Sequence, residues 1–122
     1  MEINSISCAD ALKELMDGAI LIDVRENQEI INCAFDIPKV ITIPVFNIYA
    51  IFHELSEDKK IIVADTDTED EKSWRGTITL QNGGFRNVAY LEGGMKEWLS
   101  KGLPVIKSED YLNLSNSRSC CK

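Results

Sequence analysis

"GGFRNVAYLEGGMKEWLSKGLPV", residues 83–105, joins two regular patterns that require different secondary structures. After a pair of glycines, residues 87–91 form a short apolar run, which is typical of a buried strand. Met95, Trp98 and Leu99 then fall on one side of a helix, which a Gly-Leu-Pro sequence brings to an end. The stretch therefore predicts a strand that leads into a short helix.

The same alternation of strands and helices extends over the preceding residues. Further apolar runs that predict strands occupy residues 19–24, 40–45 and 60–64. Three further segments have apolar residues at helical spacing. The first follows a capping Ser7 and contains Cys8, Ala11, Leu12, Leu15 and Met16. The second, at residues 46–55, contains Ile48, Ile51, Phe52 and Leu55, and the third contains Trp74 and Ile78 and ends before Gly83 and Gly84. Nearly continuous apolar strands that alternate with helices predict an α/β fold, in which helices cover both faces of a mostly parallel sheet.

Length and charge argue against several classes of protein. The chain has 122 residues, 44% of them hydrophobic and 27% charged, which suits one globular domain. The net charge of −7 disfavours nucleic acid and anionic membranes as partners, because both require a basic surface. No apolar run approaches the roughly 20 residues that span a bilayer, and the first ten residues lack the pattern of a secretory signal. We therefore expect a cytoplasmic protein that is monomeric by default.

The composition changes near the C-terminus. "SEDYLNLSNSRSCCK", residues 108–122, is polar and has no periodic apolar pattern. We predict one domain at residues 1–107, followed by a flexible polar tail at residues 108–122.

Charged residues follow two of the predicted strands, and the carboxyl ends of parallel strands are where ligand sites gather. Asp23 and Arg25 stand at the end of residues 19–24, and we expect this pair to tether neighbouring loops through hydrogen bonds. After residues 60–64 comes the acidic loop, which consists of Asp65, Thr66, Asp67, Thr68, Glu69, Asp70 and Glu71. This loop is the candidate functional site.

Three stretches together resemble the rhodanese-like domain family: "LIDVREN" at residues 21–27, "DIPKVITIPV" at 36–45, and residues 83–105. The resemblance extends over about residues 5–105. It implies a parallel sheet of about five strands with helices on both faces, and thiosulfate sulfurtransferase activity. In active members, a loop after the fourth strand begins with a cysteine, which takes sulfur from an anionic donor and becomes a persulfide. That cysteine must be a thiolate, which a positive environment stabilises.

The acidic loop departs from the family pattern. Aligning residues 60–64 with the family's fourth strand puts Asp65 in the place of the cysteine. A carboxylate oxygen cannot hold a persulfide, and the carboxylates that follow would repel thiosulfate, with only Lys72 and Arg75 nearby to oppose them. We therefore predict a vestigial site with no catalytic residue, in a pseudoenzyme that acts as a binding or regulatory module.

The carboxylates of the acidic loop have three interpretations. They are a solvated turn that remained after catalysis was lost, a cation site, or a recognition surface for a protein partner with a basic surface. Asp65, Asp67 and Glu69 alternate like calcium ligands, but Asp70 stands where an EF-hand loop requires glycine. We expect no metal and no cofactor.

The four cysteines leave an alternative function open, that of a sulfurtransferase or sulfur carrier with a displaced thiol. Its candidates are Cys33, Cys120 and Cys121. Cys8 and Cys33 are also interpreted as small buried apolar residues. The single histidine, His53, has no second catalytic histidine or C-x-x-C pair beside it from which to build a triad or a zinc site.

Overall fold

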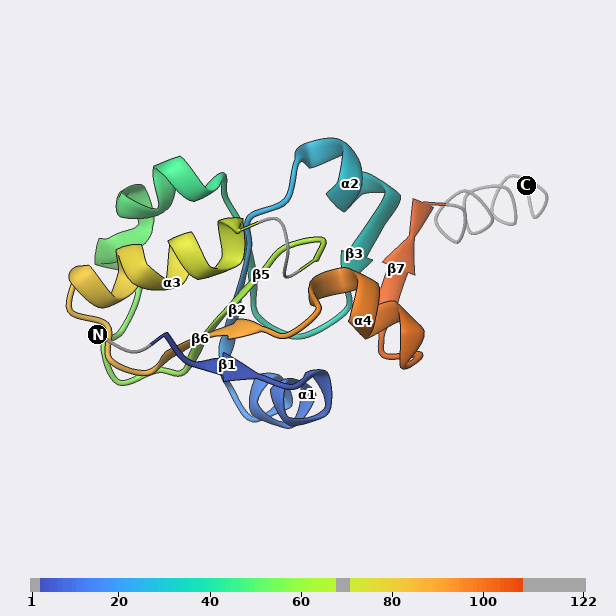
Figure 1. Ribbon diagram of the computed structural model, residues 1–122, viewed down its shortest axis with the longest axis horizontal. Helices are drawn as coiled ribbons and strands as arrows, with labels where there is room; N and C mark the ends of the chain where they lie inside the picture. The colour runs from blue at the N-terminus through green and yellow to red at the C-terminus, as the bar shows by residue number, and fades with distance from the viewer. Residues whose placement is uncertain (1–2, 68–70, 109–122) are drawn as a thin grey trace, which may run out of the picture.

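A computed structural model describes residues 3–67 and 71–108 of the chain (Figure 1). A five-stranded sheet forms its centre, with the strand order β1-β6-β5-β2-β4. Its strands are β1 (Ser5–Ile6), β2 (Ile20–Asp23), β4 (Val40–Thr42), β5 (Ile61–Ala64) and β6 (Val88–Leu91). All neighbouring pairs in this sheet are parallel, which confirms the predicted fold class.

The central strand β5 explains why its sequence is apolar without interruption. All four of its residues are buried, and they alternate between two hydrophobic clusters on opposite faces of the sheet. Ile62 and Ala64 join the cluster that contains Leu15 and Trp98. Ile61 and Val63 join the other cluster. A strand buried on both faces has no polar side to expose, so its sequence does not alternate.

Helices cover both faces of the sheet (Figure 1). One face carries α1 (Cys8–Met16) and α4 (Gly94–Ser100), and the other carries η1 (Val45–Glu54) and α3 (Lys72–Asn82). The Ser7 hydroxyl caps α1 by accepting the Asp10 N–H at 3.2 Å. None of the helices in residues 3–67 and 71–108 has the length and apolar composition needed to cross a membrane.

Some of the predicted apolar faces are rotated in the structure. Met16 was expected on the buried side of α1 but is 63% exposed, and Leu99 of α4 is also exposed. In α3 the predicted pair Trp74 and Ile78 is half-buried. Instead, α3 turns a small and mostly polar side toward the sheet, where the buried residues are Ser73, Gly76, Thr77 and Leu80. Small residues are required at these positions because α3 packs closely against η1 and β5. A Cβ on Gly76 would lie 3.0 Å from side-chain atoms of both Ile48 and Val63.

The segment predicted as an amphipathic helix at residues 46–55 is the 3₁₀ helix η1. Its buried residues Val45, Ile48 and Ile51 recur at intervals of three, which matches the three residues per turn of a 3₁₀ helix. Phe46 and Tyr49, which are also three residues apart, form a neighbouring stripe that faces solvent. The prediction of a helix was right, and its type was wrong.

A second, two-stranded antiparallel sheet was not predicted. It pairs β3 (Cys33–Phe35) with β7 (Val105–Lys107), so that Phe35 faces Val105 across the ladder. Phe35 also meets Trp98 edge-to-face, with ring centroids 5.2 Å apart. The helix α2 (Asn27–Asn32) precedes β3 directly. This small sheet closes the end of the domain next to α4.

Candidate functional site

The candidate site lies where β2 and β5 end side by side. Asp23 is opposite Ala64 in the parallel register, and the Val24 N–H donates to the Ala64 carbonyl at 3.0 Å. The next residue after Ala64 is Asp65, and both aspartates are about 1% exposed. The fold therefore buries two carboxyl groups at neighbouring strand ends, where water is largely excluded.

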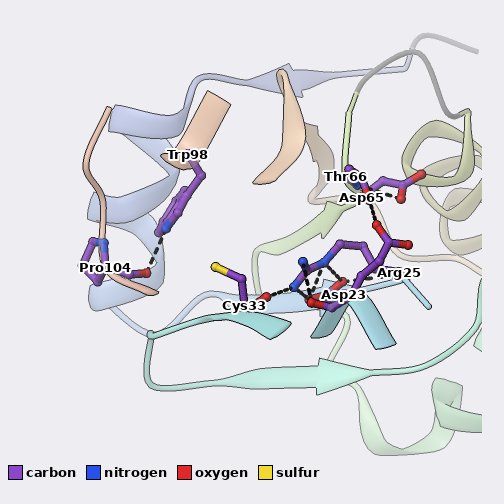
Figure 2. Close-up of polar contacts among 8 residues, drawn as sticks. Asp23, Arg25, Cys33, Asp65, Thr66, Trp98 and Pro104 are labelled. Carbon is purple, nitrogen blue, oxygen red and sulfur yellow. Dashed lines mark hydrogen bonds and ion pairs between the residues drawn. The ribbon is translucent and has the colours of Figure 1, made fainter. Parts of the chain in front are cut away.

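Arg25 forms a buried ion pair with Asp23. Its Nη2 lies 2.8 Å from one Asp23 carboxylate oxygen, and its Nε lies 3.0 Å from the other. Arg25 Nη2 also donates to the Cys33 carbonyl at 2.8 Å (Figure 2). The guanidinium carbon lies 5.3 Å from the centroid of the Phe35 ring. These contacts connect the end of β2 to β3. The hydrogen bonds of the Asp23–Arg25 pair therefore hold two separate segments of the chain together.

The main chain of the acidic loop is attached to the start of α4. The Asp65 carbonyl accepts the Met95 N–H at 2.9 Å, and the Thr66 carbonyl accepts the Lys96 N–H at 3.0 Å. This close approach requires glycine at position 94, because a Cβ there would lie 2.3 Å from the Asp65 oxygen. Gly94 also has a φ of +58°, a conformation that glycine adopts without strain.

The side chains at the start of the acidic loop have partners in the protein. One Asp65 carboxylate oxygen accepts the Thr66 N–H at 2.7 Å. The Thr66 hydroxyl donates to the Glu29 carboxylate on α2. Figure 2 shows Asp65 and Thr66 close to the Asp23–Arg25 pair.

Three ion pairs join basic side chains to described carboxylates around the loop. Lys96 lies 3.6 Å from Asp67, and Arg75 lies 3.3 Å from Glu71. A third ion pair joins Lys72 to Glu26 at 3.4 Å. Lys96 is a basic neighbour of the loop in addition to Lys72 and Arg75. Nothing in the sequence pattern near the loop indicates Lys96, because α4 brings it there from a distant part of the chain.

The end of the acidic loop lies at the start of α3. Glu71 stands at the N-cap position of this helix and makes no capping hydrogen bond with its side chain. Its φ of 65° lies in the left-handed region, and it is the only non-glycine residue with positive φ in the described part of the chain. Thr68, Glu69 and Asp70 lie outside the described residues. Within residues 3–67 and 71–108, no three side chains of His, Cys, Asp or Glu converge to hold a metal ion. Because Glu69 and Asp70 are not among them, the cation alternative stays a prediction.

The two described thiols both belong to the core cluster on the α1 side of the sheet. Cys8 is buried, and its thiol donates to the Glu92 carbonyl at 3.6 Å. Burial, followed by the negative charge of Glu97, raises the pKa of the Cys8 thiol to about 11, so the group is neutral at physiological pH. Cys33 is half-buried and packs against the same core. Figure 2 shows its sulfur directed toward Trp98 and away from Asp65. Cys120 and Cys121 lie outside the described residues.

Comparison with known proteins identifies relatives over most of the chain. The family described as rhodanese-like domain matches residues 8–101. A protein of Allochromatium vinosum named sulfurtransferase is 27% identical over 108 residues, which cover 88% of this chain and 96% of that protein.

Solved structures agree with this match. A rhodanese-related protein from Thermoplasma volcanium is 31% identical, with a TM-score of 0.70, over 84% of this chain and 97% of that chain. The rhodanese-like domain of an Anabaena protein has a TM-score of 0.71 at 22% identity, over 88% of this chain and 80% of that chain. At that identity the second likeness supports the fold alone.

Proposed function

Because the chain belongs to the rhodanese-like domain family, we propose that it is a member without sulfurtransferase activity, a pseudoenzyme that acts as a binding or regulatory module. One observation carries the proposal. In chain order β5 is the fourth strand of the parallel sheet, and the residue that follows it is the buried Asp65. We place Asp65 where active members of the family have their cysteine.

The chemistry of sulfur transfer supports this assignment. The nucleophile must attack a sulfane sulfur and keep it as a persulfide, which requires a thiolate. Asp65 offers carboxylate oxygens, and one of them accepts a hydrogen bond from the Thr66 N–H. A carboxylate at this point also disfavours the approach of an anionic donor such as thiosulfate.

The contacts of the loop give further support. The carbonyls of Asp65 and Thr66 accept the amides of Met95 and Lys96 in the first turn of α4. The Thr66 hydroxyl donates to the Glu29 carboxylate. These groups stabilise the loop by contacts within the protein. Residues of the loop that serve only to stabilise the fold are consistent with a module that binds partners on its surface and has no catalytic site.

The test is a sulfurtransferase assay with thiosulfate as donor and cyanide as acceptor. We expect the wild-type chain to form no more thiocyanate than a variant in which all four cysteines are replaced by serine. The Asp65→Cys variant is the positive comparison, because it restores a thiol at the end of β5. Turnover by the wild type above the cysteine-free background would show that the proposal is wrong.

A second candidate function is a sulfurtransferase or sulfur carrier that uses a displaced thiol. It is favoured by the name of the Allochromatium vinosum relative, which the match covers over 96% of its length. Cys33, Cys120 and Cys121 are its candidates, and Cys33 is half-buried on β3. After treatment with a sulfane donor, mass spectrometry of tryptic peptides would then find one added sulfur atom on one of these residues. The cytoplasmic location and the monomeric state stay predictions.

A further inference from the structure

The most exposed large apolar side chains of the described residues lie on η1. Phe46 is 78% exposed and Tyr49 is 66% exposed, although the same helix buries Val45 and Ile48. Together the two neighbouring aromatic side chains leave an apolar patch in contact with water, and such patches often mark interaction sites. The two exposed rings are therefore a candidate binding surface for another molecule.

A hollow runs between these rings and α3. Its volume is about 270 Å³, and its lining residues, which we name the aromatic groove, are Val45, Phe46, Tyr49, Arg75, Ile78 and Thr79. Figure 1 shows the green segment that contains η1 beside α3. A smaller hollow of about 100 Å³ shares Val45 and Phe46 with the groove and extends toward Glu26 and Lys72. Because they share these two residues, the two hollows are neighbours, and together they extend from the aromatic rings to the edge of the candidate site.

Acidic side chains stand at that end of the surface. The Glu26 side chain is 76% exposed and lines the smaller hollow, and Glu71 is about half exposed next to the groove residue Arg75. Each carboxylate has a basic partner, Lys72 or Arg75, at 3.3–3.4 Å. Exposed ion pairs of this kind are weak, so the cations of a ligand can replace them at little cost.

We propose that the aromatic groove binds a basic segment of a partner protein. An apolar side chain of the segment enters the hollow between Phe46, Tyr49 and Ile78, and its lysine or arginine residues contact Glu26 and Glu71. The net charge of −7 attracts a basic ligand over distance and opposes both an acidic peptide and a second copy of this chain. This inference rests on the proposed function, because it names the partner class and the surface of the binding module.

The test begins with a random peptide library displayed on phage, selected against the immobilised full chain. Counter-selection uses the double variant Phe46→Ser/Tyr49→Ser. We expect enriched peptides that combine a large apolar residue with several lysine or arginine residues and that do not bind the double variant. Enrichment of acidic peptides, equal binding to the double variant, or no enrichment over the empty support would overturn the proposal.

The enriched peptide is then synthesised, and its affinity is measured by fluorescence anisotropy. Phe46→Ser is expected to weaken binding at least about tenfold, because an aromatic anchor carries much of the energy of such an interface. The matched control is Met16→Ser, which removes another exposed apolar side chain, from α1 on the opposite face of the sheet, and should leave the affinity unchanged. Equal losses in the two variants would mean that the groove is not the binding surface.

Charge substitutions at the other end of the surface give expected effects of opposite sign. Glu71→Gln should weaken binding of the basic peptide about threefold and reduce its dependence on salt. Lys72→Gln should strengthen binding by a similar factor, because it removes the cation that competes for Glu26. A weaker complex with Lys72→Gln would contradict the expected direction of the charges.

Two further measurements separate the possible failures. Sedimentation of the wild type tests for a second copy in the groove: a dimer that Phe46→Ser dissociates would overturn the proposal of a basic partner. The thiocyanate assay is independent of the groove. Turnover there would refute the proposed inactivity, and failed peptide selection would refute the groove alone.

Discussion

Replacing Gly94 by alanine tests the attachment of the acidic loop to α4. A Cβ at this position would lie 2.3 Å from the Asp65 carbonyl oxygen and 2.8 Å from the Thr66 carbonyl oxygen, both of which belong to the main chain. The loop cannot avoid the new methyl group by changing a rotamer. It has to move away from α4, which stretches the bonds from Met95 N–H and Lys96 N–H.

The expected cost has two parts. An alanine with φ near +58° costs about 1 kcal/mol, because the left-handed region is strained for residues with a Cβ. Weakening two hydrogen bonds of the main chain adds about 1 kcal/mol each. We therefore expect Gly94→Ala to lower the free energy of unfolding by about 3 kcal/mol, which for a domain of this size lowers the melting temperature by about 10 °C or more.

Gly102→Ala is the matched control. Gly102 has a similar φ of +66°, but a Cβ there would meet no heavy atom within 4 Å. It should therefore lose only the conformational part, about 1 kcal/mol. Urea unfolding followed by tryptophan fluorescence measures both variants. Equal losses at the two glycines would refute the reasoning, because the close contact with Asp65 and Thr66 would then have no cost.

Three further predictions concern charges and a thiol. Arg25→Met should lower the free energy of unfolding by about 3–5 kcal/mol, because it leaves the Asp23 carboxylate buried without its cation, and urea unfolding checks this. Lys96→Gln should change it by less than about 1 kcal/mol in the same assay, since the Lys96 side chain is 78% exposed and its attraction to Asp67 is screened by water. Cys8 keeps its proton up to a pKa of about 11 in the folded chain, against 9.0 for an ordinary thiol, so the stability it contributes is fully present below pH 9 and is lost as the pH rises toward 11. The wild type should therefore lose more stability than Cys8→Ala over that interval, and a parallel pH profile for the two proteins would contradict the burial of the thiol.

Four of the five strands of the parallel sheet could be predicted from the sequence because their signal is local, whereas β1, with only two residues, has no apolar run and was missed. Strands such as residues 61–64 are buried on both faces, so every residue is apolar and the run stands out. The start of α1 was equally clear, since the Ser7 hydroxyl caps it through a contact three residues away. Features that depend on neighbours in sequence were therefore predicted well.

Features that depend on tertiary packing were not predicted. The pairing of β3 with β7 joins segments about 70 residues apart, and neither short strand has a distinctive pattern of its own. The type of η1 depends on whether its apolar residues recur every three or every 3.6 positions, which Val45, Ile48 and Ile51 decide only once their burial is known.

The candidate site shows the same division. The position of the candidate site was predicted from the rule that ligand sites gather at strand ends, and the alignment of Asp65 with the family's cysteine stays a prediction from the resemblance. The contacts that stabilise it come from elsewhere in the chain: Lys96 from α4 and Glu29 from α2. Their distance from the acidic loop in the sequence hides them from any local pattern.

The intact mass of the protein after incubation with a sulfane donor tests the central claim most directly. The claim is that the chain offers no thiolate at the end of β5, where the family requires one to receive sulfur. We predict that the wild type gains no sulfur atom and that the Asp65→Cys variant gains one. A wild-type protein that retains an added sulfur atom would contradict the proposed pseudoenzyme and support the displaced-thiol alternative.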